Sequence, residues 1–182
     1  MIHPFSTAQC VGYVAFALGA AAFLQKNDRR LKFLNGSQCI FYAAHFALLG
    51  NYPAMGSLIV SATRSFLSLK TRSRWVAVLF LAMNLAVGWV LVHSRAGWLP
   101  IAGGCLATIA LFLMRGVPMR LVLLASTFCW MANNILSGSI GGVMLETIIA
   151  IANVSTIIRM TRARATLRQP PRQAAAAAGT KR

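Results

Sequence analysis

Charged residues are scarce in this sequence. Only 11% of its 182 residues are charged, and only Asp28 and Glu146 are acidic. Soluble domains usually carry about a quarter charged residues and fewer than half apolar ones. Here 58% of the residues are hydrophobic, and the mean hydropathy is +0.66. So few charged residues provide too little polar surface to cover a water-soluble globule. We therefore expect an integral membrane protein.

Signatures of catalysis and of metal binding are also missing. No GxSxG motif, phosphate-binding loop or paired carboxylate occurs, so we expect no enzymatic activity. Three scattered histidines and two acids do not form a metal site, and we predict no cofactor. The four cysteines lie in apolar runs without CxxC spacing and are interpreted as packing residues: Cys10, Cys39, Cys105 and Cys129.

Positive charge, by contrast, is abundant, with 18 Lys and Arg and a net charge of +16. Such a balance is typical of nucleic-acid-binding proteins. Here the basic residues form short clusters between apolar runs, which is how membrane topology is encoded. We therefore expect no specific nucleic acid partner, although the carboxyl tail would attract anionic lipid or nucleic acid non-specifically. The first apolar run has no basic segment before it, so no secretory signal is predicted.

The apolar runs predict seven transmembrane helices. A spanning helix needs about 20 apolar residues, because lipid offers the backbone no hydrogen-bond partner. Tight boundaries rich in Gly, Pro, Asn and Ser separate several runs and indicate antiparallel neighbours. The fold class is therefore all-α and polytopic, with spans at 7–25, 33–50, 54–71, 75–92, 98–114, 120–137 and 142–159.

The basic residues give the predicted orientation. With seven spans, sixteen of the eighteen Lys and Arg fall on one side, and only Arg95 and the intramembrane Arg64 do not. Basic loops face the cytoplasm, so the amino terminus is expected outside and the carboxyl terminus inside. Residues 1–164 then form the membrane domain. Residues 165–182 are predicted to be a disordered basic tail, since they cannot bury enough apolar surface.

Two parts of the chain resemble each other at an offset of 88 residues. Gly50 aligns with Gly138, Lys32 with Arg120, and the polar positions also correspond: Tyr42 with Trp130 and His45 with Asn133. A seven-span chain can hold two parallel three-helix repeats joined by an inverting helix. We predict this 3+1+3 arrangement, with repeat one at 7–72, a linker helix at 75–92 and repeat two at 98–162.

Polar residues within the spans mark a candidate binding site. Polar side chains are costly in hydrocarbon, so they tend to face partners or a cavity. Counting 1.5 Å per residue from the turns places one polar layer roughly 6 to 8 Å deep and another roughly 15 to 18 Å deep. The candidate substrate-binding residues are Gln38, Tyr42, His45, Arg64, Trp130, Asn133, Glu146 and Asn153.

Several of these residues have structural alternatives. By depth, Glu146 is expected to pair with His45, either as a static hydrogen bond or as a proton-coupling pair. Arg64 is too deep to pair with Glu146, and either attracts an anionic solute group or extends toward the cytoplasmic head groups. Asn133 and Asn153 would otherwise join helices by hydrogen bonds. Tyr42 and Trp130 form either core packing or a stacking wall.

The sequence also resembles a known family. Gly-Asn-Tyr-Pro-Ala at 50–54, Leu-Lys-Thr-Arg-Ser at 69–73 and Ser-Gly-Ser-Ile-Gly-Gly at 137–142, with Arg64 and Glu146, resemble the bacterial inner-membrane protein family typified by YgjV. The resemblance covers about residues 8 to 165 and implies a bacterial inner-membrane location. A more distant resemblance is to the PQ-loop, SWEET and SemiSWEET transporters, in which asparagine and aromatic residues such as Asn153 and Trp130 would contact solute. No Pro-Gln motif stands in the first or fifth helix.

These observations favour one function and leave an alternative open. The favoured hypothesis is a transporter of a small polar or anionic solute that works by alternating access between two three-helix bundles. The alternative is a non-transporting receptor-like or assembly protein, in which the polar residues pair internally. Either function is compatible with a homo-oligomer in the lipid bilayer.

Overall fold

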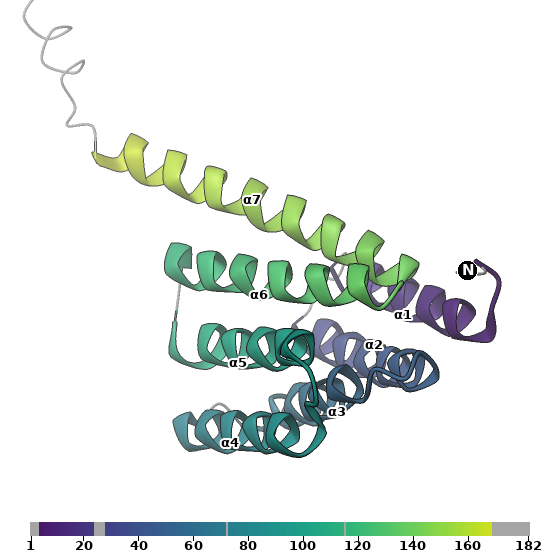
Figure 1. Ribbon diagram of the computed structural model, residues 1–182. Helices are drawn as coiled ribbons and strands as arrows, with labels where there is room; N and C mark the ends of the chain where they lie inside the picture. The colour runs from purple at the N-terminus through teal and green to yellow at the C-terminus, as the bar shows by residue number, and fades with distance from the viewer. Residues whose placement is uncertain (1–3, 24–27, 72, 115, 169–182) are drawn as a thin grey trace, which may run out of the picture.

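The computed structural model describes residues 4–23, 28–71, 73–114 and 116–168 (Figure 1). Within these ranges the chain forms seven α-helices and one short 3-10 helix, η1, as the apolar runs predict. Helix α7 continues into the first residues of the predicted tail, whereas residues 169–182 lie outside the described part. The bounds are α1 Thr7–Phe23, α2 Asp28–Leu48, α3 Tyr52–Leu67, α4 Arg74–Leu91, η1 Arg95–Gly97, α5 Trp98–Leu113, α6 Gly116–Leu136 and α7 Ile140–Arg168.

The helices form a closed ring with one helix outside it. Helix α1 packs on α2, α2 on α3, α3 on α5, α5 on α6, α6 on α7, and α7 returns to α1. Helix α4 lies against α3 and α5 on the outside of this ring. In Figure 1, α4, α5 and α6 lie one above another, and the carboxyl end of α7 extends beyond them. The ring therefore surrounds an interior reached by side chains of six helices.

Hydrophobic side chains cover the outside of the ring, and many polar side chains lie within it. Trp75 and Trp89 on α4 are 82% and 86% exposed, whereas His45, Asn134 and Ser57 are fully buried. Lipid, unlike water, stabilises this distribution, since it solvates apolar side chains and leaves polar groups to pair inside. The surface therefore fits a bilayer.

Four helical segments are long and apolar enough to cross a membrane: 74–91, 95–113, 116–136 and 140–162. Residues 7–22 of α1 form a shorter apolar helix. Helix α3 has only 16 residues and buries Ser57, Ser61, Arg64 and Ser65, which lower its hydropathy. Its polar residues face neighbouring helices rather than lipid, so a low hydropathy is compatible with a spanning position in the ring.

The ring has two chemically different ends. We call one end of the ring the neutral end; it carries the connections 49–51, 92–97 and 137–139. Of the residues in these three connections, Arg95 is the one Lys or Arg. The connections after α1, α3 and α5 and the end of α7 lie at the opposite, basic end. Lys26, Arg72 and Arg115 belong to those connections but lie outside the described residues.

Two of the neutral-end turns depend on glycine. Gly50 and Gly138 have φ angles of 73° and 66°, in the left-handed region that disfavours other residues. Such a glycine ends the preceding helix and turns the chain at once into the next. The turns therefore hold α2 against α3 and α6 against α7.

The ring closes where α1 crosses α7 at two glycines. A Cβ atom added to Gly141 would lie 2.8 Å from the carbonyl oxygen of Gly12. No larger side chain fits there without moving the backbone, since both surfaces are main chain. This close approach brings the amino end of α1 beside the turn at 137–139.

Candidate functional site

His45 joins three helices near the neutral end. Its Nδ1 lies 2.7 Å from the Ala8 carbonyl oxygen on α1, and its Nε2 lies 2.7 Å from the Ser139 hydroxyl, which caps α7. A carbonyl only accepts, so Nδ1 carries a proton, and in the neutral ring Nε2 accepts from Ser139. The predicted pair of His45 with Glu146 is therefore wrong. Helix α7 begins at Ile140, and Glu146 lies about 10 Å further along it than Ser139.

Asn133 occupies the corresponding place on α6. Its Oδ1 accepts a 2.8 Å hydrogen bond from Nδ2 of Asn51, which also donates to the Ser137 hydroxyl at 2.7 Å. Asn51 caps α3, since its Oδ1 accepts from the Ala54 N–H. The side chain of Asn133 thus joins α6 to the start of α3. Its own Nδ2 is buried and has no hydrogen-bond partner among the described residues.

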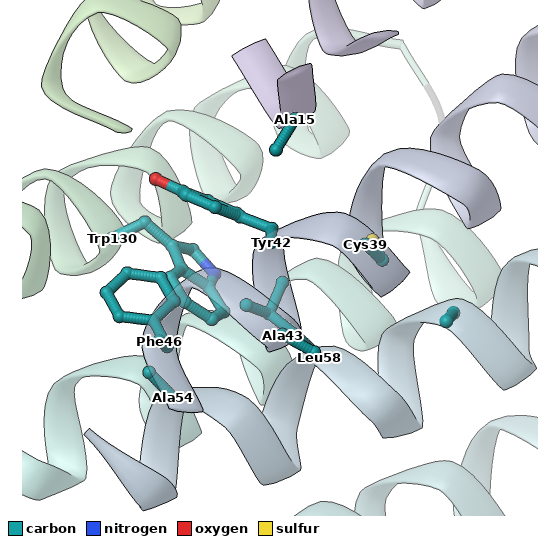
Figure 2. Close-up of a cluster of buried hydrophobic side chains, with 9 residues drawn as sticks. Ala15, Cys39, Tyr42, Ala43, Phe46, Ala54, Leu58 and Trp130 are labelled. Atoms are coloured by element: carbon teal, nitrogen blue, oxygen red, sulfur yellow. The ribbon is translucent and has the colours of Figure 1, made fainter. Parts of the chain in front are cut away.

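The centre of the ring is filled by aromatic side chains from α2 and α6 (Figure 2). The Tyr42 hydroxyl donates a 2.7 Å hydrogen bond to Oδ1 of Asn134, and the rings of Phe46 and Trp130 lie 6.4 Å apart. In Figure 2 the rings of Tyr42, Phe46 and Trp130 gather between the two helices. Tyr42 is 2% exposed and Trp130 8% exposed, so both are core residues here.

These contacts are reciprocal under the offset of 88 residues. His45 on α2 contacts the capping residue of α7, and its counterpart Asn133 contacts the capping residue of α3, Asn51, whose counterpart is Ser139. Likewise, Tyr42 contacts the counterpart of Phe46, and Phe46 contacts the counterpart of Tyr42. If one residue contacts the counterpart of a second, the second contacts the counterpart of the first. This is the pattern expected when two similar segments pack around a two-fold axis.

Arg64 is buried and points toward α5. Its Nη1 donates to the Thr108 hydroxyl at 2.5 Å and lies 3.4 Å from the Gly104 carbonyl oxygen. The side chain is only 7% exposed, so the prediction that it extends to the head groups is wrong. Glu146, 6% exposed, interacts with Thr127 on α6. Among the described residues, neither charge forms an ion pair with the other, as their depths predict.

The remaining two predicted residues lie apart from this cluster. Asn153, 6% exposed on α7, accepts a 3.3 Å hydrogen bond from Nη1 of Arg120, toward the basic end. Gln38, 7% exposed on α2, lies beside Gly19 of α1. The structure therefore brings Tyr42, His45 and Trp130 into one cluster with Phe46 and places Asn133 in the hydrogen-bonded group with Asn51. Four predicted residues lie outside both groups: Gln38, Arg64, Glu146 and Asn153.

Sequence reasoning missed several participants in this cluster. Asn51 and Ser139 were interpreted only as turn residues, although each directly precedes a helix, where a side-chain oxygen commonly caps it. Gln9 near the start of α1 was not singled out, yet it is 1% exposed and bonds to the turn before α7. Its polar amide in an apolar run was the available signal.

A pocket of about 400 Å³ opens at the neutral end. The turn 49–51, the connection between α4 and α5 and the end of α6 surround it. Its lining includes the hydrogen-bonded group described above, Asn51, Asn133 and Ser137. A polar group that enters from this end therefore meets amide and hydroxyl groups.

Comparisons with known proteins give one consistent result. Residues 6–164 match the model of a family described as bacterial inner membrane protein, Imp-YgjV. The chain is 39% identical over 155 residues to the inner membrane protein YgjV of Escherichia coli (strain K12), and the alignment covers 85% of each chain. No solved structure matches significantly.

Proposed function

This chain belongs to the Imp-YgjV family of bacterial inner membrane proteins, and we propose that it carries a small polar solute across that membrane. Carriage would occur by alternating access between two three-helix bundles, α1–α3 and α5–α7, with α4 as the linker helix. The amino terminus would be periplasmic and the carboxyl terminus cytoplasmic, because the basic end carries most of the Lys and Arg.

The repeated turns support the two-bundle arrangement. In the first turn, the N–H groups of Leu49, Gly50 and Asn51 donate to the carbonyls of His45, Ala47 and Phe46. In the second, the N–H groups of residues 137, 138 and 139 donate to the carbonyls of 133, 135 and 134. Every one of these bonds recurs at the same offset of 88 residues, so the two turns share one local fold.

The distribution of hydrogen bonds along the ring is the observation that carries the proposal. Toward the neutral end, described side chains bond between the bundles, as in His45 with Ser139 and Asn51 with Asn133. Toward the basic end, three described pairs bond within one bundle: Lys32 to Ser68, Asn35 to Ser65 and Arg120 to Asn153. Arg64 bonds across the bundles there, to Thr108 and Gly104 of α5, and would release them for that end to open. A protein closed at the neutral end and able to part at the basic end would have this pattern.

The buried charges would then lie on the solute path. Arg64 and Glu146 are both buried and are not neutralised by each other. Ionisable groups inside a membrane commonly mark an ion or substrate pathway, because their burial is costly without function. Opening at the basic end would admit water and solute to both side chains.

Thiol labelling of Cys39 tests this proposal without knowledge of the solute. Cys39 is 5% exposed on α2, and about 14 Å of helix separates it from the neutral end. The other described cysteines, Cys10, Cys105 and Cys129, are replaced by alanine. A membrane-impermeant thiol reagent is then applied to spheroplasts and to inverted vesicles. We expect Cys39 to react in inverted vesicles, where the basic end is outside.

A disulfide lock makes the result specific. Asn51 and Ser137 approach within 2.7 Å across the bundles, so Asn51→Cys with Ser137→Cys should hold the neutral end closed on oxidation. Asn35→Cys with Ser65→Cys, a 2.9 Å pair within one bundle, is the control. The first lock should raise the labelling of Cys39 from the basic side several-fold, and the second should not. Absence of labelling from either side, with and without the lock, contradicts alternating access.

The second candidate is a non-transporting receptor-like or assembly protein. The satisfied hydrogen bonds of His45, Tyr42 and Asn51 favour it, since polar residues that pair internally need no solute. Flux measurements in proteoliposomes distinguish the two candidates. Each protein is offered a library of small amides, amino acids and sugars. If the chain is a carrier, native protein should take up a solute faster than the Arg64→Ala and Glu146→Gln variants. Uptake at background for all three proteins favours the second candidate.

A further inference from the structure

The pocket at the neutral end has a counterpart in the other half of the ring, and that counterpart is filled. There, α1 inserts Gln9 into the turn between α6 and α7. The Gln9 amide donates from Nε2 to the Gly138 carbonyl at 2.6 Å and accepts at Oε1 from the Ile140 N–H at 3.2 Å. One side-chain carboxamide thus satisfies both a turn carbonyl and the first N–H of helix α7.

Gly97 stands where the repeat would place a second Gln9. It is 88 residues further along the chain and lies beside the start of α3, since a Cβ added to it would be 3.4 Å from Cγ of Pro53. Gln9 correspondingly bonds to the first residue of α7. Because glycine has no side chain, no amide of the chain enters this place, where a Cβ would lie 3.2 Å from Cγ1 of Val92. Gly97 and Pro53 both line the pocket.

The backbone groups that an amide would engage are present and unused. The counterparts of Gly138 and Ile140 are Gly50 and Tyr52, which also line the pocket. Among the described residues, no side chain bonds to the Gly50 carbonyl or to the Tyr52 N–H. The later N–H groups of α3 are engaged, since Ala54 and Met55 both donate to Asn51. The first N–H of α3 therefore differs from that of α7 only in lacking a carboxamide.

A second group in the pocket also lacks a partner. Asn133 is 3% exposed, lines the pocket, and has a buried Nδ2 without an acceptor. A buried donor without an acceptor is destabilising, so a ligand oxygen that draws the Asn133 side chain toward the pocket would be favoured. The described lining contains no Lys, Arg, Asp or Glu, so it favours an uncharged ligand over an ion.

From the repeat we infer that this pocket binds a small neutral solute through a carboxamide or peptide group. The solute amide donates to the Gly50 carbonyl and accepts from the Tyr52 N–H, as Gln9 does at the other turn. A second oxygen of the solute accepts from Nδ2 of Asn133 once this buried amide turns toward the pocket. The inference names the solute class of the proposed carrier, but equilibrium binding at this pocket does not require transport.

Two probes with the same malonyl skeleton test the chemistry. Malonamide carries carboxamide donors and acceptors, whereas dimethyl malonate carries acceptors alone. Saturation-transfer NMR with the full chain in lipid nanodiscs measures the binding of each. Native protein should bind malonamide at least tenfold more tightly than the diester. Equal binding of the two probes, or no malonamide binding, overturns the inference.

Substitution of Gly97 places the binding in this pocket. Gly97 has φ of −61°, so other residues are compatible with its backbone. Gly97→Gln should supply the amide from the chain itself and reduce malonamide affinity at least tenfold. Gly97→Ala adds the same Cβ without the amide and should bind malonamide within threefold of native protein. Unchanged malonamide affinity in Gly97→Gln overturns the inference.

Chemical rescue at the filled turn provides a second measurement. Gln9→Ala removes a group close in size to acetamide from between Gly138 and Ile140. Acetamide should raise the melting temperature of this variant more than that of native protein, and methyl acetate should not. Equal shifts for the variant and native protein contradict the assigned role of the amide.

Discussion

The turns at 49–51 and 137–139 have the same backbone and different surroundings. Each ends a helix with a glycine at positive φ, and each begins the next helix with a capping side chain. Gln9 seals the second turn, whereas Gly97 leaves the first beside a pocket. The difference shows that local sequence determines the turn, while a residue from a distant helix determines whether the space beside it is open.

Gly142 and Ala54 are counterparts under the offset of 88 residues but differ in the space around them. Substitution of Gly142 should give the largest of the expected effects. A Cβ on Gly142 would collide with the Tyr42 hydroxyl and lie 2.6 Å from Cγ of Asn134. Gly142→Ala should therefore lower the free energy of unfolding by about 2–3 kcal/mol, the upper part of the range for overpacking. Chemical denaturation in detergent micelles measures this change.

Ala54 provides the matched control, since it is the counterpart of Gly142 and is fully buried. Ala54→Gly should lower the free energy of unfolding by about 1 kcal/mol, through helix propensity. If Gly142→Ala is no more destabilising than Ala54→Gly, the packing around residue 142 is no tighter than the packing around residue 54.

A somewhat smaller effect tests what the two turns share. Gly50 and Gly138 have φ of 73° and 66°, so alanine at either position should lower the free energy of unfolding by about 1–2 kcal/mol. The two losses should be alike, because the backbone bonds around them are the same. Thermal unfolding of both variants checks this, and a twofold difference between them would weaken the equivalence.

Removal of one hydroxyl probes the contact between α2 and α6. Tyr42→Phe leaves Oδ1 of Asn134 without its donor, while Nδ2 of that residue already lacks a partner. The free energy of unfolding should fall by about 1–2 kcal/mol, as for other buried acceptors left unpaired. Tyr52→Phe, at a residue 55% exposed, is the control and should change it by less than about 0.5 kcal/mol. Equal losses of unfolding free energy in the two variants would contradict a stabilising role for the hydrogen bond from Tyr42 to Asn134.

The smallest effect compares the two corresponding hydrogen bonds, from α2 to the cap of α7 and from α6 to the cap of α3. Double-mutant cycles to alanine should give coupling energies of about 0.5–1 kcal/mol for His45 with Ser139 and for Asn51 with Asn133. Asn51 caps α3 and Asn153 lies on α7 toward the opposite end, so this pair should show no coupling within about 0.3 kcal/mol. Coupling in only one of the two bonds would show that the halves are joined unequally.

Depth along a helix was predictable from the sequence only in part, and direction around the helix was not. Residue counting predicted that Arg64 does not pair with Glu146, and in the structure Arg64 bonds to Thr108 instead. The same count paired Glu146 with His45, whose ring instead reaches Ser139. Residue counting gives height at 1.5 Å per residue, whereas partners also depend on where each helix begins and on its rotation in the ring. Thr108, the partner of Arg64, comes from a helix whose position only packing determines.

The amino-acid sequence by itself determined the helices, their order and the turns at Gly50 and Gly138, because apolar run length and backbone sterics are local properties. Only the tertiary structure decided which polar groups meet. The Gln9 amide reaches the 137–139 turn because α1 crosses α7 at Gly12 and Gly141. The pocket lies beside Gly97 because this residue, at the end of η1, brings no side chain to the corresponding place. Ring closure is a long-range packing event, and no stretch of the chain carries it alone.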